Sequence, residues 1–123
     1  NRDTGACIAS GSYPAAGMII IPCSLTTVAA VRTSYADTLL RRAAQVTLKE
    51  SRPMILVPRE TPLTTLHLRQ LTELSEAGVC IMPAMPGFYH SPSDIEALVD
   101  HFVMRVLDQM GFDIELSKRW GTK

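Results

Sequence analysis

Two adjacent ionisable residues, Arg59 and Glu60, directly follow an apolar run that ends at Pro58. An arginine supplies a fixed cation for an anionic ligand, and a carboxylate can transfer a proton. The same pair could form a surface ion pair, which contributes only ~0–1 kcal/mol to stability. Because both residues leave a predicted strand at the edge where ligands bind, we favour a functional site.

Hydroxyl groups follow a second apolar run, in the segment 22–27. Ser24 is a good helix N-cap, and the free N–H groups of a helix N-terminus bind phosphate or the polar edge of a heterocycle. Taken alone, this serine is more typical of helix capping than of a ligand site.

A stiff loop with prolines and a glycine, residues 83–90, follows a third apolar run. Met85, Phe88 and Tyr89 in this loop offer apolar and aromatic walls for a flat ligand. A loop that plugs the core would have the same composition, and the sequence leaves the two interpretations equal.

Basic residues recur in two further places. Arg42, Gln45 and Lys49 are spaced to lie on one helical face, for which exposure to solvent is the default interpretation. Arg105 borders the apolar stripe of the last predicted helix, where arginine usually extends its charge to water and less often binds phosphate. Trp120, after two cations, could cover a site or lie in an interface.

The elements that position these residues alternate along the chain. Three apolar runs, each ended by a proline, predict strands buried on both faces at 18–21, 54–57 and 79–82. Helical patterns follow at about 24–31, 37–49, 65–76 and 93–107. Gly78 is placed to end the third helix, and Ser93 with Glu96 predicts a capping box on the last. The order predicts an α/β fold with a parallel sheet, whose ligands bind at the carboxyl ends of the strands.

Composition favours one globular domain over residues 1–123 and excludes several classes of protein. The chain has 12 Lys+Arg against 12 Asp+Glu, so its formal net charge is zero, which argues against nucleic-acid or polybasic membrane binding. The longest apolar run, 18–22, is far shorter than a membrane span. Three cysteines do not make a disulfide framework, which favours a reducing cytoplasm.

Several site motifs are absent from the sequence. The histidines His67, His90 and His101 are scattered, and no cysteine stands at metal-ligand spacing from them. The sequence contains no Walker loop, no dinucleotide glycine fingerprint and no Gly-x-Ser-x-Gly elbow. The residues therefore predict an anion-binding, partly apolar crevice without a metal.

The start of the chain is unusual for such a fold. Residues 1–17 contain no convincing strand, the first residue is not Met, and three strands make a small sheet. We therefore expect that an N-terminal strand–helix portion of the domain is missing from this sequence.

Six motifs in order along the chain make the sequence resemble the UbiX-type flavin prenyltransferases, formerly called aromatic-acid or polyprenyl-hydroxybenzoate decarboxylases. Each motif is weak alone, and their order and spacing together are specific from about Ala9 to Trp120. The motifs are Pro22-Cys23-Ser24, Arg42-Ala43-Ala44, Leu48-Lys49-Glu50, Val57-Pro58-Arg59-Glu60-Thr61-Pro62-Leu63, Phe88-Tyr89-His90 and Val106-Leu107-Asp108-Gln109.

The resemblance implies a Rossmann-like, flavodoxin-like domain with a parallel sheet in three layers. It implies an enzyme that joins the dimethylallyl group of dimethylallyl phosphate to N5 and C6 of reduced FMN and needs no metal. The prenylated FMN would serve UbiD-type decarboxylases as their cofactor. It also implies a cytoplasmic homo-oligomer, commonly a dodecamer.

The resemblance also implies roles for individual residues. Arg59 would contact the flavin and lie near the donor phosphate, with Glu60 as the proton-transfer group. Arg42 and Lys49 would complete the phosphate pocket. FMN would bind at Ser24, Leu25, Thr26 and Thr27, and the dimethylallyl phosphate at Tyr89 and Arg105, with Trp120 in a C-terminal lid.

The sequence departs from the family pattern at its start. The family's first strand leads into a Gly-Ala-Ser-Gly flavin loop, whereas Ala9-Ser10-Gly11-Ser12 resembles a later family segment. Two alternatives follow. One is a flavin-dependent cysteine decarboxylase of the related fold, disfavoured because segment 83–86 lacks that family's asparagine. The other is a catalytically inactive remnant that binds partners, disfavoured because the charged pocket residues are retained.

Overall fold

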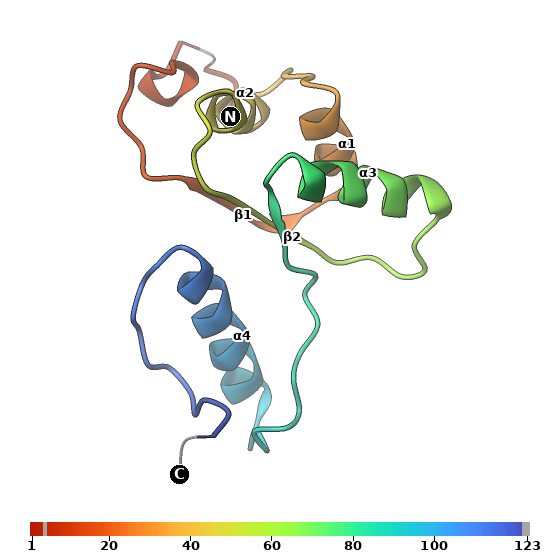
Figure 1. Cartoon of the computed structure of the whole chain (residues 1–123), viewed down its shortest axis with the longest axis vertical. Helices are drawn as coiled ribbons and strands as arrows, with labels where there is room; N and C mark the ends of the chain where they lie inside the picture. Colours follow the sequence, from red (N-terminus) through yellow and green to blue (C-terminus); the bar gives the residue numbers. More distant parts are fainter. Residues whose placement is uncertain (4, 122–123) are drawn as a thin grey trace. The chain divides into compact units, whose positions relative to one another are not determined.

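A computed structural model describes residues 1–3 and 5–121 of the chain. The chain forms two compact units, residues 1–83 and 84–123. The first unit contains the sheet and three α-helices, and the second contains one long helix with its flanking segments (Figure 1). Each unit is described by itself, and the expectation of one domain stays a prediction.

The first unit is built on a parallel three-stranded sheet in the order β1-β2-β3. The strands are β1 (Met18–Cys23), β2 (Met54–Pro58) and β3 (Cys80–Ile81), and Met18 pairs with Met54 and Ile55 with Cys80. The predicted α/β fold with a parallel sheet is confirmed.

The prediction that each strand is buried on both faces is correct only for the central strand, β2. Every residue of β2 is buried, whereas Ile21 in β1 is 49% exposed. Pro22 has no N–H to donate to the sheet, and the register of β1 against β2 shifts between Ile20 and Cys23. The end of β1 therefore leaves the regular ladder and turns partly toward solvent.

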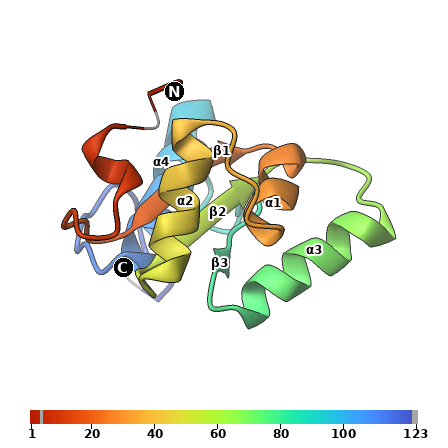
Figure 2. The ribbon, with the colours of Figure 1, turned by 90° about the horizontal axis from the view of Figure 1, so that it is seen from above.

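Three α-helices cover one face of this sheet in the first unit (Figures 1 and 2). They are α1 (Leu25–Arg32), α2 (Leu39–Lys49) and α3 (Thr65–Glu76), and α1 contacts both of the others. A short 3₁₀ helix, η1 (Cys7–Ala9), contacts α2. Because the strands follow one another in spatial order, crossovers of one hand place the connecting helices on one face.

The core of the first unit lies between this helical layer and the sheet. Leu56 of β2, Val28 of α1 and Ala44 of α2 are completely buried in it, and Leu74 of α3 is 3% exposed. Helix α3 ends as predicted, since Gly78 has a φ of +97° and donates its N–H to the Ser75 carbonyl.

The second unit is organised around α4 (Ile95–Gln109). Its N-cap is Asp94, whose Oδ1 accepts the N–H of Ala97 at 2.8 Å. The predicted capping box of Ser93 with Glu96 is therefore wrong. With Asp94 as the cap, Glu96 is the second helical residue and not the third, so it cannot return a bond to the cap.

Candidate functional site

A cavity of about 580 Å³ lies in the first unit at the carboxyl ends of β1 and β2. We call it the strand-end cavity. It brings together the predicted FMN-binding segment and the Arg59–Glu60 pair, and its lining residues are Ile20, Pro22, Cys23, Ser24, Leu25, Thr26, Thr27, Leu40, Arg59, Glu60 and His67. Its size and its mixture of apolar walls and a few polar groups are typical of a small-molecule site.

The N-terminus of α1 supplies the polar wall of the strand-end cavity. Ser24 Oγ accepts the N–H of Thr27 and donates to Thr27 Oγ1, both at 3.1 Å. The serine therefore caps the helix, as the simpler interpretation of the sequence held. Helix geometry still leaves the N–H groups of Leu25 and Thr26 without intrahelical partners, and the helix dipole is positive at this end. The arrangement suits an anionic or electron-rich ligand.

Arg59 and Glu60 leave β2 at the mouth of the strand-end cavity, and both are exposed. Glu60 Oε1 accepts the N–H of Thr61 at 3.0 Å, which holds the carboxylate beside the strand end. No ion pair joins Arg59 to Glu60 among the described residues, so each side chain can face a ligand. Cys23 in the same cavity is not a nucleophile at neutral pH, because burial raises its pKa to about 11.

His67 also lines the strand-end cavity, although the sequence analysis considered histidines only as metal ligands. The ring Nδ1 of His67 accepts a hydrogen bond from the backbone N–H of Thr64. The backbone N–H of His67 donates to Thr64 Oγ1. The ring thus caps α3 while facing the cavity. The signal in the sequence was a threonine followed three residues later by a side chain able to complete a capping box.

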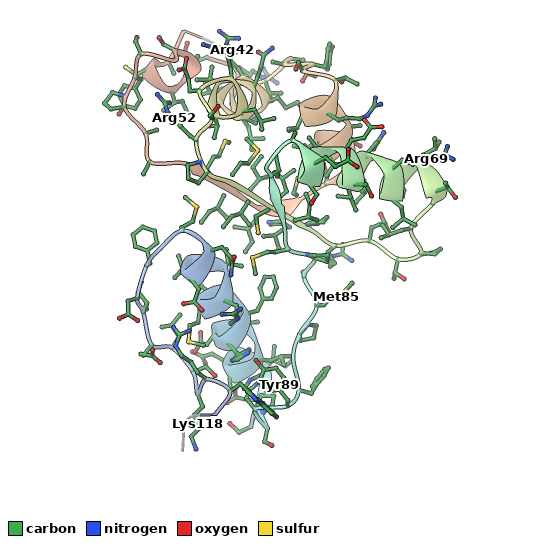
Figure 3. All side chains as sticks on the ribbon, viewed as in Figure 1. Arg42, Arg52, Arg69, Met85, Tyr89 and Lys118 are labelled. Carbon is green, nitrogen blue, oxygen red and sulfur yellow. The ribbon has the colours of Figure 1, made fainter. Side chains whose placement is uncertain are left out.

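Arg42 and Lys49 do not line the strand-end cavity. Arg42 and Arg52 both lie in the first unit (Figure 3). Arg42 Nε donates to the Ala9 carbonyl and its Nη1 to Gln45, and Arg52 Nη2 donates to the Gly11 carbonyl. Lys49 pairs with Glu50, which holds the pKa of that carboxyl below its usual range. Arg42 and Arg52 thus hold the N-terminal segment against α2 and the turn that follows it. The role of Arg42 and Lys49 in a phosphate pocket stays a prediction.

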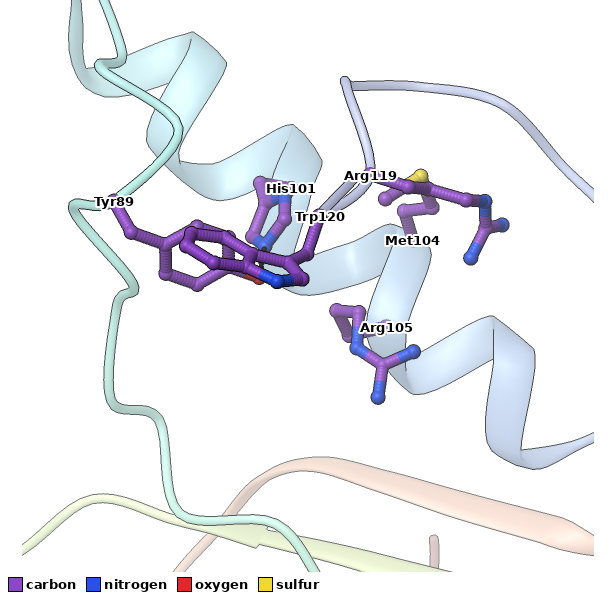
Figure 4. A pocket seen from close by; sticks show the side chains of 6 residues that line it. All are labelled: Tyr89, His101, Met104, Arg105, Arg119 and Trp120. Atoms are coloured by element: carbon purple, nitrogen blue, oxygen red, sulfur yellow. Dashed lines mark hydrogen bonds between the residues drawn. The ribbon is translucent and has the colours of Figure 1, made fainter. Parts of the chain in front are cut away.

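A second pocket, of about 290 Å³, lies in the second unit. We call it the tyrosine pocket. It brings together the three residues predicted to bind the prenyl donor, Tyr89, Arg105 and Trp120, and adds His101, Met104 and Arg119 (Figure 4). The Tyr89 and Trp120 rings meet edge to face, with centroids 5.5 Å apart at 78°. Two aromatic walls beside arginine suit a ligand with an apolar part and an anionic part.

Asp108 holds both arginines of the tyrosine pocket. Arg105 Nη1 donates to Asp108 Oδ2 at 2.7 Å, and Arg119 donates two hydrogen bonds to the same carboxylate at 2.7 and 2.9 Å. These bonds, with Arg119 the stronger partner, lower the pKa of Asp108 to about 2. The carboxylate therefore stays ionised and fixes the segment that carries Trp120 against α4.

His101 and His90 form a stacked pair beside Tyr89, with ring centroids 4.0 Å apart. His101 is 4% exposed, and its ring accepts or donates hydrogen bonds on both nitrogens, with Tyr89 Oη at 2.9 Å and Ser117 Oγ at 3.3 Å. Burial, and then the neighbouring His90, Arg105 and Arg119, lower the pKa of His101. The contacts of this histidine were not predicted, because the histidines of the sequence were considered only as metal ligands.

The prediction that Ser24, Arg59 and Tyr89 share one cavity spans both units, and it stays a prediction. Within residues 1–3 and 5–121, no group of three or more His, Cys, Asp or Glu side chains is arranged to hold a metal ion. No helix in that part of the chain is long and apolar enough to cross a membrane.

Comparisons with known proteins define the class. The model of the Flavoprotein family matches residues 4–107, and the chain therefore belongs to this family. Within the family, the chain is similar to UbiX-type flavin prenyltransferases, which confirms the resemblance seen in the sequence. The flavin prenyltransferase UbiX of Synechocystis sp. is 53% identical over 118 residues, which are 96% of this chain and 57% of the relative.

Solved structures give the same similarity. The crystal structure of AnUbiX (PadA1) in complex with FMN and dimethylallyl pyrophosphate matches with a TM-score of 0.96 and 43% identity, over 99% of this chain and 65% of that one. A dodecameric FMN-dependent UbiX-like decarboxylase from Escherichia coli O157:H7 matches with a TM-score of 0.94 and 49% identity, over 98% and 65%. The chain thus spans about three-fifths of the length of its relatives.

Proposed function

We propose that the protein is a flavin prenyltransferase that joins the dimethylallyl group of dimethylallyl phosphate to reduced FMN. The observation that carries the proposal is the strand-end cavity, which gathers the α1 N-terminus, Arg59 and Glu60 at one edge of the sheet. Relatives about 50% identical to this chain are named flavin prenyltransferases. The crystal structure of AnUbiX contains FMN and dimethylallyl pyrophosphate.

The residues of the strand-end cavity fit FMN. The ligand carries a phosphate and a flat ring system with polar edges, and the cavity offers helix N–H groups, hydroxyls and an arginine beside apolar walls. Ser24, Leu25, Thr26, Thr27 and Arg59 would hold the cofactor. When bound, reduced FMN supplies the electron-rich atoms that receive the dimethylallyl group.

The leaving phosphate needs positive charge and hydrogen-bond donors. Breaking the C–O bond of dimethylallyl phosphate leaves the electron pair on a phosphate oxygen, so donors aimed at this oxygen lower the barrier. Arg59, Tyr89 and Arg105 would supply these donors, and Arg42 and Lys49 are proposed as further cations. Glu60 would assist transfer of the proton that prenylation releases, and the rings of Tyr89 and Trp120 would exclude water from the allylic group.

The product would pass to another enzyme. We propose prenylated FMN as the cofactor of a UbiD-type decarboxylase, and we place the reaction in the cytoplasm because the cysteines Cys7, Cys23 and Cys80 are all free thiols.

We also propose a homo-oligomer. The UbiX-like decarboxylase from Escherichia coli is dodecameric. Apolar side chains on this chain, including Leu66, Met85 and Ile95, are 67, 69 and 79% exposed, which is typical of interface residues. Native mass spectrometry should give a multiple of the chain mass, and a purely monomeric protein would contradict the proposal.

The decisive experiment mixes the full-length protein with reduced FMN and dimethylallyl phosphate without oxygen. We expect a flavin whose mass has increased by one dimethylallyl group, together with free phosphate. An unchanged flavin under these conditions, with FMN bound, would show that the protein is not a prenyltransferase. Carbon dioxide released from a peptidyl cysteine would support the decarboxylase alternative.

A further inference from the structure

We propose that His101 is a positioning residue that holds the Tyr89 hydroxyl in place to donate to the phosphate of the prenyl donor. The proposal rests on the proposed function, because it assumes that Tyr89 contacts this phosphate. It adds a buried residue of α4 and a serine of the C-terminal segment to the machinery of the tyrosine pocket.

Tyr89 needs such an anchor because it lies on a loop and is 53% exposed. An exposed side chain on a loop loses rotational freedom when it binds a ligand, which weakens binding. His101 Nε2 lies 2.9 Å from Tyr89 Oη, and the two rings meet edge to face at 5.3 Å and 86°. This contact limits the positions that the hydroxyl can take before a ligand arrives (Figure 4).

The anchor is itself fixed from three sides. His101 belongs to helix α4, and its side chain is almost fully buried. The His90 ring stacks on it at 4.0 Å with the planes 16° apart, and Ser117 Oγ lies 3.3 Å from its Nδ1. The imidazole is thus held by the loop, the helix and the C-terminal segment of the second unit.

The chemistry of a neutral imidazole explains how this contact could serve phosphate binding. A neutral ring has one N–H donor and one acceptor nitrogen. If Ser117 donates to Nδ1, then Nε2–H donates to Tyr89 Oη and leaves the tyrosine proton free to donate to the phosphate. Burial lowers the pKa of His101, and His90, Arg105 and Arg119 add to this effect against a weaker backbone hydrogen bond to Lys118 that raises it, so the ring remains neutral over a wider range of pH. We assign this tautomer to the ring, with Ser117 Oγ as the donor to Nδ1.

The test is a double-mutant cycle on the full-length protein, with calorimetric titration of inorganic phosphate and kcat/KM for dimethylallyl phosphate as readouts. Tyr89→Phe and His101→Leu should each weaken phosphate binding about tenfold, as expected for loss of one hydrogen bond to a charged group. The double variant should be no weaker than Tyr89→Phe alone. His101→Gln, whose amide can still donate to the tyrosine, should recover most of the affinity.

Glu96→Gln is the matched control, because Glu96 is an exposed residue of the same helix. It should leave phosphate affinity unchanged, and any loss of thermal stability should be small, as expected for one charge in the first turn of a helix. Additive losses in the double variant, or a folded His101→Gln protein that binds as weakly as His101→Leu, would overturn the proposal. Absence of phosphate binding by the wild type would overturn it too. If the two residues are coupled in phosphate binding but no prenylated FMN forms, only the proposed function fails.

Discussion

Single side chains determine what the two pockets can do. Among the residues that the structure describes, no ion pair joins Arg59 to Glu60 at the strand-end cavity, whereas Arg105 and Arg119 share the carboxylate of Asp108. Arg119 thereby fastens the C-terminal segment to α4, whereas Arg59 is proposed to bind a ligand.

At the residue scale, Glu60→Gln should slow prenylation by about 10²–10⁴-fold, the usual contribution of a general acid or base. The amide keeps the size of the side chain and cannot take up the proton. FMN affinity should change little. Single-turnover formation of prenylated FMN measures the effect, and Glu76→Gln at the exposed end of α3 is the control. A Glu60→Gln protein with normal turnover would remove Glu60 from the mechanism.

A second residue-scale prediction concerns acid. The pKa of Asp108 is lowered to about 2 in the fold, against about 3.9 in an unfolded chain. Its pairing with Arg119 and Arg105 therefore contributes stability above about pH 4, which is lost as the pH falls toward 2. Trp120 is the single tryptophan of the chain, so its fluorescence reports on this segment.

We expect the Trp120 signal of the wild type to change between about pH 4 and pH 2. In Asp108→Asn, which lacks the titrating carboxylate, the altered signal should already be present at neutral pH. Asp113→Asn is the control, because Asp113 is exposed and is not among the residues that line the tyrosine pocket. An acid transition that persists unchanged in Asp108→Asn would contradict the assignment.

Helix ends decide how the elements present these side chains. The N-terminus of α1 borders the strand-end cavity because Ser24 stops β1 and starts the helix at once. The start of α4 depends on Asp94, a residue that the sequence pattern did not single out.

At the element scale, Asp94→Ala should lower the free energy of unfolding by about 1 kcal/mol, because it removes the side chain that caps the Ala97 N–H. Ser93→Ala should have an effect of about 0.5 kcal/mol or less, as for most surface substitutions. Urea denaturation followed by circular dichroism measures both. Equal losses in the two variants, or a larger loss in Ser93→Ala, would indicate that Ser93 is the cap, as the sequence predicted.

The molecule as a whole is organised by β2. This central strand pairs with both neighbours, has every residue buried, and ends at the residues that carry Arg59 and Glu60 into the strand-end cavity. Packing around β2 therefore sets both stability and the position of the site.

At the scale of the whole molecule, Leu56→Ala should destabilise the fold by about 2–5 kcal/mol, since it leaves a cavity in the core. Ile21→Ala in β1 should cost less, because that side chain is half exposed. Chemical denaturation measures both, and a ranking in the opposite order would show that β2 is not the centre of the core.

The sequence by itself determined the elements and one of the two pockets. Apolar runs ended by prolines and helical periodicity are local signals, so the strands and helices could be located, with errors such as the cap at Ser93. Parallel strands bring their carboxyl ends to one edge, which is why Ser24 and Arg59 could be predicted to meet.

Only the tertiary structure decided the contacts of His101 with Tyr89 and Ser117, and of Asp108 with Arg119. These bonds join residues 11 to 16 positions apart across a loop, a helix and an irregular segment. Such contacts depend on side-chain rotamers and on the path of the segments, for which the sequence has no periodic signal. They are nevertheless what makes the tyrosine pocket a definite arrangement of donors.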